Sequence, residues 1–314
     1  MTPSPLSAAG GDLLVAEDLG LASGPPRALA RGSTSVSALP PASPCNARPP
    51  FSLAMLMRLH LTYLWRHRRP LSLTAPRLST ELVQHRKLTD RDLGMPGLID
   101  KLAVKRFVSE TLGPEWVTPT LWSGGALPAE PPCSRPFVVK SRHGCKHVRA
   151  VCSAADDWEA ARRDATSWMK QSYGGWLDEW GYRDVPRGLL IEPFVGVAPV
   201  LPIDYKLYVF HGRVAAIQVN LDRATNHRWT LFDRGWRRLS DGGIEVDVVP
   251  PLTLSRMIEG AEILADGFDF VRIDFYDVGA VPRFGEMTFY PGSGLDPFDP
   301  PLLDALLGRF WLAR

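Results

Sequence analysis

Residues 270–294, FVRIDFYDVGAVPRFGEMTFYPGSG, contain the two runs that decide the fold of this chain. The runs VRIDFY and RFGEMTFY are rich in aliphatic and aromatic residues, and a short turn with Gly279 and Pro282 separates them, so each run predicts a strand. Each strand carries one carboxylate, Asp274 or Glu286, among residues that a sheet would bury. A buried carboxylate is costly unless it is paired, hydrogen-bonded or bound to a metal. Together with the glycine-rich turn that follows, the stretch predicts a site for a divalent cation and phosphate.

The composition is that of an ordinary globular protein and gives no sign of nucleic-acid binding. The 314 residues are 45% hydrophobic and 22% charged, with a net charge of +2. Four cysteines without C-x-x-C spacing favour a reducing cytoplasm over a disulfide framework or a cysteine-based metal site. No run reaches the roughly 18–20 apolar residues of a membrane span, and Asp12, Glu17 and Asp18 fall where a signal peptide would be hydrophobic. These observations predict a cytoplasmic protein.

The N-terminal region differs in character from the rest of the chain. Residues 1–50 are rich in Pro, Ser, Ala and Gly without a sustained hydrophobic period, which predicts a disordered extension, or translated sequence upstream of an internal start. The segment 51–69, FSLAMLMRLHLTYLWRHRR, then combines an apolar stretch with a basic end. It fits either an interfacial membrane helix or a packed helix whose basic end is solvated. Arg58 and His60 interrupt its apolar face, so the packed helix is favoured.

Helices and strands are expected in mixed order, without an internal repeat, which predicts an α+β fold. The strand at residues 137–140 enters a polar loop, SRHGCKH, and returns through VRAVC, as in a hairpin. A second hairpin joins DYKLYVF to RVAAIQVNL through the two-residue turn His211-Gly212. Further helices are expected at residues 78–90, 99–111, 156–173 and 254–264, and a further strand at residues 188–194.

Several charged side chains outside the opening stretch are candidates for binding. Lys140 ends a buried strand, where it fits either a phosphate ligand or a solvated strand-end lysine, and the loop 141–147 offers amides and cations that could cover a polyphosphate. Glu192 in GLLIEPF is either an edge-strand carboxylate or part of a linker that holds a flat base. Asp204 and Lys206 share one face of a strand, so they could contact ribose hydroxyls and phosphates, or form a plain cross-strand ion pair.

Two further features leave alternatives open. Asp274 and Glu286 could be satisfied by the neighbouring Arg272 and Arg283 in place of a cation. The loop LDRATNH, residues 221–227, could bind substrate or could simply form a turn.

In this order, the residues resemble an ATP-grasp enzyme. More narrowly, the motifs DKLAVKRFV, LPIDYKLYVFHGR, LDRATNHR, FVRIDFY and FGEMTFYPGSG are similar to the TupA-like ATP-grasp family, which is associated with teichuronopeptide and other cell-surface polysaccharide biosynthesis. The resemblance covers residues 78–312 and implies two α+β subdomains that clamp a nucleotide. It divides the chain into a disordered extension (1–50), an N-terminal helical region and linker (51–135), a small or lid subdomain (136–196) and a C-terminal subdomain with the metal site (197–314).

The resemblance also implies a role for each matching side chain. Residues that would bind the ATP are Lys101, Lys140, Gly144 and Lys146 at the phosphates, Glu192, Phe194 and Val195 at the adenine, and Asp204 and Lys206 at the ribose and γ-phosphate. Residues that would bind Mg²⁺ are Asp274, Glu286 and Thr288, the last standing where the generic ATP-grasp motif has asparagine. Residues that would act on the substrate carboxylate or the transferring phosphoryl group are Arg223, Arg272 and Lys206, with turn amides of Ser293 and Gly294 near the oxyanion.

The function implied by the resemblance is an ATP- and Mg²⁺-dependent carboxylate–amine ligase that forms an acylphosphate from a cell-envelope or polysaccharide precursor. Its substrates would be small-molecule or glycan-linked carboxylates and amines, without nucleic acid. The segment 51–69 leaves open a peripheral association with the inner face of the membrane or with polysaccharide assembly, and no oligomeric state is indicated. The alternatives are a kinase that phosphorylates a hydroxyl or sugar, and a degenerate nucleotide-binding scaffold. Retention of Lys140, Lys206, Asp274 and Glu286 together argues against degeneracy.

Overall fold

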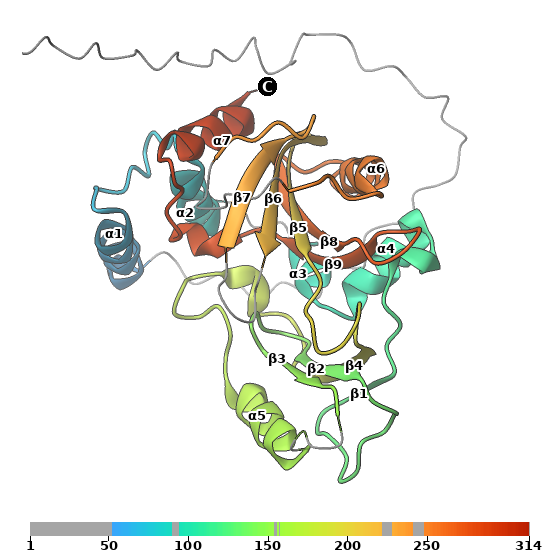
Figure 1. Cartoon of the computed structure of the whole chain (residues 1–314). Coiled ribbons are helices and arrows are strands. Elements are labelled where there is room, and N and C mark those ends of the chain that lie inside the picture. The colour runs from blue at the N-terminus through green and yellow to red at the C-terminus, as the bar shows by residue number, and fades with distance from the viewer. Residues whose placement is uncertain are drawn as a thin grey trace, which may run out of the picture. The chain divides into compact units, whose positions relative to one another are not determined.

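The computed structural model describes residues 52–89, 94–153, 156, 158–221, 228–240 and 248–313. In this part of the chain the strands are β1 (Trp122–Gly124), β2 (Phe137–Ser141), β3 (Val148–Val151), β4 (Leu189–Pro193), β5 (Asp204–Phe210), β6 (Arg213–Leu221), β7 (Arg228–Asp233), β8 (Phe270–Tyr276) and β9 (Arg283–Thr288). They form an antiparallel sheet of order β7-β6-β5-β8-β9 and a smaller antiparallel sheet of order β1-β4-β2-β3 (Figure 1).

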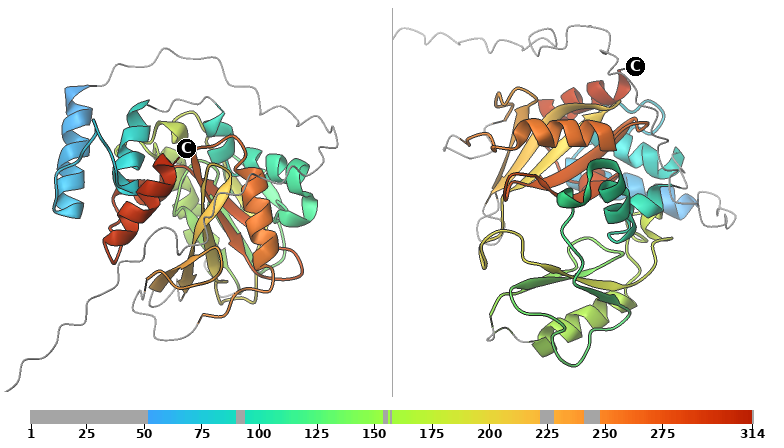
Figure 2. Two further views of the ribbon diagram at one scale, coloured as in Figure 1. Left: turned by 90° about the horizontal axis from the view of Figure 1, so that it is seen from above. Right: turned by 90° about the vertical axis from the view of Figure 1, so that its right-hand side faces the viewer.

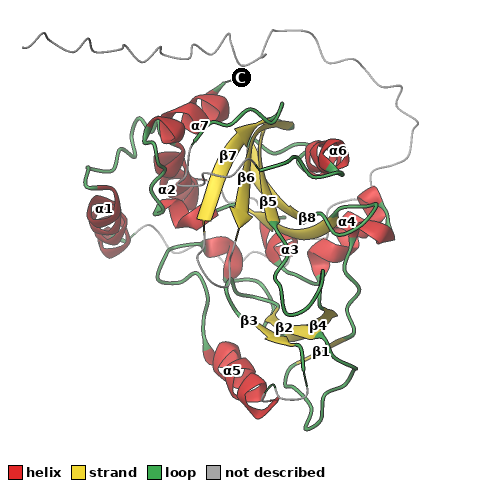
Figure 3. Cartoon of the chain, viewed as in Figure 1, coloured by secondary structure: helices red, strands yellow, loops and turns green. Residues whose placement is uncertain are grey.

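Helices surround both sheets in the described residues (Figure 3). The α-helices are α1 (Leu53–His67), α2 (Ser79–Thr89), α3 (Met95–Ile99), α4 (Ala103–Leu112), α5 (Trp158–Lys170), α6 (Leu254–Leu264) and α7 (Leu302–Leu312). The short 3-10 helices are η2 (Pro114–Trp116), η3 (Trp180–Tyr182) and η4 (Pro291–Gly294).

A tight turn sets the pairing of β5 with β6 in the larger sheet. His211 and Gly212 have φ angles of 49° and 74°, the left-handed conformations that a two-residue hairpin turn requires. On the other side of β5, Lys206 lies opposite Asp274 on β8, and Asp274 lies opposite Glu286 on β9. Side chains that lie opposite one another in a sheet project from the same face, so these three charged side chains share one face.

The two faces of the larger sheet are covered differently. Helix α6 contacts β5 and β6 and lies across one face, with Met257 and Leu264 buried (Figure 2). At one end of the other face, the ring of Trp311 on α7 packs 6.1 Å from that of Phe210 and 4.3 Å from that of Phe270. Polar side chains occupy the rest of this second face, which therefore remains accessible to a ligand.

The smaller sheet has an apolar core of its own. Phe137 and Val139 on β2 and Ile191 on β4 are fully buried against α5. The ring of Trp158 on α5 meets that of Phe137 edge-on, with the ring centroids 5.8 Å apart. Because alternate side chains of a strand point to opposite faces, this packing directs Lys140 to the face away from α5.

One carboxylate joins α7 to α2 and to the segment between α1 and α2. Asp304 on α7 accepts hydrogen bonds from the backbone N–H of Thr80 at 2.9 Å, from the hydroxyls of Ser79 and Thr80 at 2.7 and 2.6 Å, and from the guanidinium of Arg69 at 2.6 Å. A negative charge at the N-terminus of α2 is favourable for the helix dipole. Gly308 allows the close approach of the helices, because a Cβ atom there would lie 2.0 Å from the carbonyl oxygen of Arg77.

Most of the elements expected from the sequence are confirmed. Both hairpins, the helix at residues 254–264 and the two strands of the opening stretch lie where they were expected. The helix expected at residues 99–111 is wrong at its start, because the chain forms α3, turns at Asp100, and begins α4 at Ala103. Strands β1 and β7 and helix α7 were not expected. Residues 1–50 lie outside the described part of the chain, and the proposed domain boundaries remain a prediction.

Candidate active site

A cavity of about 1120 Å³ is lined by residues of both sheets. The smaller sheet and the loop after β2 contribute Lys140, Gly144 and Lys146, and the turn before α4 contributes Lys101. The larger sheet contributes a second polar group from neighbouring strands, namely Asp204, Lys206, Tyr208, Gln218, Asn220, Arg272, Asp274, Glu286 and Thr288. Most of the described site residues proposed from the sequence therefore meet in this one cavity, and the exceptions among them are Glu192, Phe194 and Val195.

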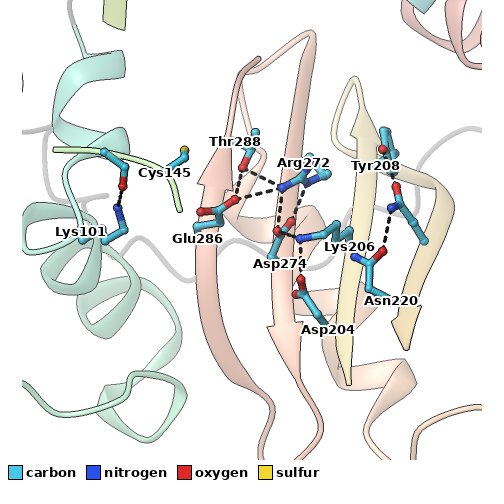
Figure 4. Close-up of polar contacts among 12 residues, drawn as sticks. Lys101, Cys145, Asp204, Lys206, Tyr208, Asn220, Arg272, Asp274, Glu286 and Thr288 are labelled. Atoms are coloured by element: carbon cyan, nitrogen blue, oxygen red, sulfur yellow. Dashed lines mark hydrogen bonds and ion pairs between the residues drawn. The ribbon is translucent and has the colours of Figure 1, made fainter. Parts of the chain in front are cut away.

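Lys206 lies between two carboxylates on the larger sheet (Figure 4). Its Nζ is 2.5 Å from Oδ2 of Asp274 and 2.6 Å from Oδ2 of Asp204. Burial alone would lower the pKa of Lys206, but the charges of Asp274 and Asp204 raise it above its usual range. Lys206 is therefore a fixed cation at neutral pH, held in place by its two carboxylate partners.

Arg272 connects the two carboxylates that were predicted to bind a metal (Figure 4). Its Nη2 donates to Oδ2 of Asp274 at 2.8 Å, to Oε1 of Glu286 at 3.0 Å and to the hydroxyl of Thr288 at 3.1 Å. Its Nε donates to Oδ1 of Asp274 at 2.8 Å. Burial would raise the pKa of Asp274, but the charges of Arg272 and Lys206 hold it below its usual value. Arg272 thus pairs with both carboxylates, as in the alternative to a bound cation that the sequence left open. Arg283 does not take part in this pairing, because it donates to the carbonyl of Glu115.

The oxygen atoms around Arg272 also fit a hard divalent cation. Oxygens of Asp274, Glu286 and Thr288 all accept hydrogen bonds from the same nitrogen, Nη2 of Arg272, so the three oxygens surround one position. Mg²⁺ takes oxygen ligands and is usually held by one or two carboxylates together with substrate phosphates. No group of three or more His, Cys, Asp or Glu side chains that could hold a metal occurs among the described residues. The donor set thus fits a cation that shares its coordination with a bound phosphate.

A second charge cluster lies on the smaller sheet. The buried carboxylate of Glu192 forms ion pairs with Lys140, at 2.6 Å, and with Lys105 on α4. Burial raises the pKa of Glu192, but the two lysines bring it below its usual value. For Lys105 burial lowers the pKa despite the attraction of Glu192. The sequence did not indicate Lys105, although it lies one helical turn beyond Lys101 in the same motif.

The side chains proposed for the adenine lie apart from the rest. Glu192, Phe194 and Val195 are absent from the cavity lining, and the backbone N–H of Phe194 donates to the carbonyl of Pro136 at 3.2 Å. Glu192 is occupied by its two lysines, as described above. These three side chains therefore do not line the cavity, and their role in base binding remains a prediction.

The loop after β2 is held by specific contacts. Lys101 donates to the carbonyl of Gly144 at 2.5 Å, and Ser141 and His147 share a hydrogen bond of 2.9 Å between Oγ and Nδ1. The ring of His147 stacks on that of Trp168 at 5.5 Å, with 6° between the planes. Burial lowers the pKa of Lys101. The loop thus presents Lys146 and the carbonyl of Gly144 at the cavity in a defined conformation.

The turn after β9 is also tightly engaged. Ser293 has a φ of 56°, an uncommon value for a residue other than glycine, and its backbone N–H donates to the carbonyl of Tyr290 at 2.8 Å. Lys87 on α2 donates to the hydroxyl of Ser293 at 2.7 Å and to its carbonyl at 2.9 Å. The amide of Ser293 is therefore used within the turn, contrary to the prediction that it faces an oxyanion.

One cavity residue, Tyr208, was not predicted although the sequence contained a signal for it, and one predicted residue, Arg223, lies outside the described part of the chain. Tyr208 follows Asp204 and Lys206 on the same face of β5, and its hydroxyl donates to Oε1 of Gln218 at 2.8 Å. Strand alternation was the signal that would have identified Tyr208. Arg223, proposed as a catalytic residue, lies outside the described residues.

Comparisons with known proteins give one family and several structures. The model of the family described as TupA-like ATPgrasp matches residues 81–312. D-alanine–D-alanine ligase from Bacillus anthracis has a TM-score of 0.38 and 13% identity, covering 69% of this chain and 65% of that one. N5-carboxyaminoimidazole ribonucleotide synthetase from Thermus thermophilus has a TM-score of 0.37 and 16% identity, covering 67% and 51%. The chain thus spans less than two thirds of the length of these ligases. No curated protein sequence matches it.

Proposed function

The chain belongs to the TupA-like ATP-grasp family and has an ATP-grasp fold, and we propose that it is an ATP-dependent carboxylate–amine ligase acting on a cell-envelope or polysaccharide precursor. The observation that carries this proposal is the charge arrangement of the cavity. Lysines of the smaller sheet and its loop face carboxylates of the larger sheet across one space. A polyphosphate in that space would meet lysines on one side and, on the other, carboxylates together with Lys206 and Arg272.

The carboxylates on the larger sheet support a role for Mg²⁺. Asp204, Asp274 and Glu286 would repel the phosphates of ATP if nothing intervened, because like charges at close range are unfavourable. Asp274, Glu286 and Thr288 would hold the cation, and Arg272 would then be released from them toward the phosphates. A bound Mg²⁺ neutralises charge on the transferring phosphoryl group.

The remaining residues can be assigned to the two steps of ligation. In the first step an oxygen of the substrate carboxylate attacks the γ-phosphorus of ATP, and the bond to the β-phosphate oxygen breaks, which yields an acylphosphate and ADP. In the second step an amine attacks the acyl carbon, loses a proton, and displaces inorganic phosphate. In this proposal the phosphates are bound by Lys101, Lys140 and Lys146, and the ribose is bound by Asp204. The negative charge on the transferring phosphoryl group is stabilised by Lys206 and Arg272. Preorganised cations of this kind supply much of the rate in phosphoryl transfer.

The proposed cellular role is inferred from the family to which the chain belongs, and the proposed location is inferred from the requirement for ATP. We propose a cytoplasmic site of action, where ATP is available, and glycan-linked or small-molecule carboxylates and amines as substrates. The competing function, a kinase for a hydroxyl or a sugar, would use the same ATP site but would need no amine. A scaffold without catalysis would form no ADP with a carboxylate, an amine or a sugar.

Hydroxylamine trapping separates these functions. The full chain is incubated with Mg·ATP, hydroxylamine and a panel of amino acids and uronic acids, and hydroxamate and ADP are measured. A ligase gives hydroxamate and ADP in equal amounts with an active carboxylate, because hydroxylamine intercepts the acylphosphate. ADP formed with a neutral sugar and without hydroxamate would identify a kinase. If Mg·ATP failed even to raise the melting temperature, the nucleotide site itself would be refuted.

A further inference from the structure

Helix α1 presents an apolar face that does not pack against the rest of the described residues. Leu53, Met57, Leu61, Leu64 and Trp65 expose between 47% and 74% of their surface. Their spacing of one, three and four residues places them on one side of the helix. The opposite side is packed, since Leu59 and Tyr63 are buried with Leu71 in a small apolar cluster. Helix α1 is therefore apolar on two sides, one of which is exposed, and the helix lies at the periphery of the described fold (Figure 2).

The charge of α1 has a single sign. The helix contains no Asp or Glu, and its last turn carries Arg66 and His67, followed by Arg68. Arg58 and His60 were predicted to interrupt the apolar face; Arg58 pairs with Asp178, whereas His60 is exposed. A second copy of the helix would bring like charges together, whereas an anionic surface would complement them.

The exposed face continues to the edge of the cavity. Thr62, Trp65 and Arg66 of α1 are among the cavity-lining residues, and so is Trp176, which is 71% exposed. Tryptophan is favoured at the boundary between water and hydrocarbon because one end of its ring system is apolar and the other is polar. Helix α1 lies before residues 81–312, so the family match assigns it no role. No described helix is long and apolar enough to cross a membrane.

We propose that α1 docks the protein onto an anionic lipid bilayer, with its exposed apolar face in the headgroup region and the exposed Arg68 at its end against the lipid phosphates, since Arg58 and Arg66 are paired with Asp178 and Asp296. An apolar face with Trp and Leu beside a basic segment is the arrangement typical of interfacial helices. In this orientation the edge of the cavity that contains Trp65 faces the membrane surface. The proposal concerns a binding surface and does not depend on the reaction proposed above.

Vesicle flotation tests the proposal with the full chain. Phosphatidylcholine vesicles are compared with and without phosphatidylglycerol, at low and high salt. We expect binding to the anionic vesicles, weakened by salt, and a loss of about tenfold or more in Leu61→Glu. Arg68→Gln should weaken binding less. Leu252→Glu introduces the same charge at a side chain that is 100% exposed elsewhere, and it should bind as the original chain does.

Two measurements keep the test decisive. Leu61 is exposed, so Leu61→Glu should retain the melting temperature, and light scattering should report the same oligomeric state for all variants. Equal vesicle binding by Leu61→Glu and Leu252→Glu would overturn the proposal, as would the absence of binding by the original chain. A dimer that Leu61→Glu dissociates, without vesicle binding, would identify a second copy as the occupant of this face.

Discussion

Paired substitutions at the centre of the larger sheet separate a structural carboxylate from one that serves a bound cation. Asp274 is 2% exposed and accepts hydrogen bonds from Arg272 and Lys206. Glu286 lies opposite it on β9, but its side chain is 36% exposed and contacts Arg272 and Thr288. Asp274→Asn and Glu286→Gln remove the same charge from facing positions, so they form a matched pair.

The expected losses of stability differ because the burial of the two side chains differs. Removing one partner of a buried ion pair costs about 3–5 kcal/mol, and the carboxylates that remain, Asp204 and Glu286, should reduce this to about 2–3 kcal/mol for Asp274→Asn. A partly exposed pair contributes about 0–1 kcal/mol, which is the loss expected for Glu286→Gln. In a domain of this size 1 kcal/mol shifts the melting temperature by about 2–4 °C. Asp274→Asn should therefore melt about 4–12 °C lower, and Glu286→Gln less than about 4 °C lower.

Thermal melts with and without Mg·ATP then test the role of Glu286. A ligand at one hundred times its Kd stabilises the folded state by about 2.7 kcal/mol, or about 5–11 °C here. Glu286→Gln should lose most of this rise while remaining nearly as stable as the original chain. Glu159→Gln, an exposed carboxylate paired with Arg162 on α5, is the control and should change neither quantity. A full Mg·ATP rise in Glu286→Gln, or equal stability of the two central variants, would refute the reasoning.

Three further changes test other parts of the molecule. Glu192→Gln should lower the free energy of unfolding in urea by about 2–4 kcal/mol, because Lys105 and Lys140 would keep buried charges without their shared partner. Phe137→Ala should cost about 3–5 kcal/mol in the same measurement and abolish the Mg·ATP rise, since the side chain is fully buried in the core that supports Lys140. Burial lowers the pKa of Lys87 to about 8, so between about pH 8 and about pH 10.4 the unfolded chain binds more protons and Lys87 makes stability rise with pH. Lys87→Met should therefore show a shallower rise over this window in urea unfolding.

Each of these changes has a control or a contrary outcome. Asp164→Asn removes a carboxylate that is 38% exposed beside Arg149, so it should cost far less than Glu192→Gln. Val148→Ala lies in the same sheet as Phe137 but is 53% exposed, and a loss comparable to that of Phe137→Ala would contradict the packing argument. Parallel pH profiles for the original chain and Lys87→Met would show that Lys87 does not titrate in this window.

Strand periodicity made the larger sheet and much of its polar face predictable. In DYKLYVF and VRIDFY, alternate positions carry the charged residues, and alternate positions of a strand share a face. The hairpin turn His211-Gly212 then fixes which side chains lie opposite one another. These local rules place Asp204 and Lys206 on one face, but only the family resemblance brought Asp274 to them, because no local pattern sets the pairing of β5 with β8.

Contacts between distant elements could not be predicted in the same way. Lys105 on α4 meets Glu192 on β4, and no local pattern connects positions so far apart in the chain. Arg272 had two possible partners in the sequence, and only the β8–β9 register shows that it reaches Asp274, Glu286 and Thr288 together. Strand β1 has three residues, too few for a periodic pattern to emerge.

The bonds of Asp304 have a consequence for the order of folding. Asp304 contacts Thr80 across 224 positions of the chain, and α7 packs along α2. During synthesis the N-terminal helices leave the ribosome long before their partner does. Contacts of such long sequence separation form slowly, and the surfaces that wait for them are exposed in the meantime. We therefore expect α2 to remain without its N-terminal carboxylate until α7 has been synthesised, which makes the docking of α7 on α2 a late step in folding.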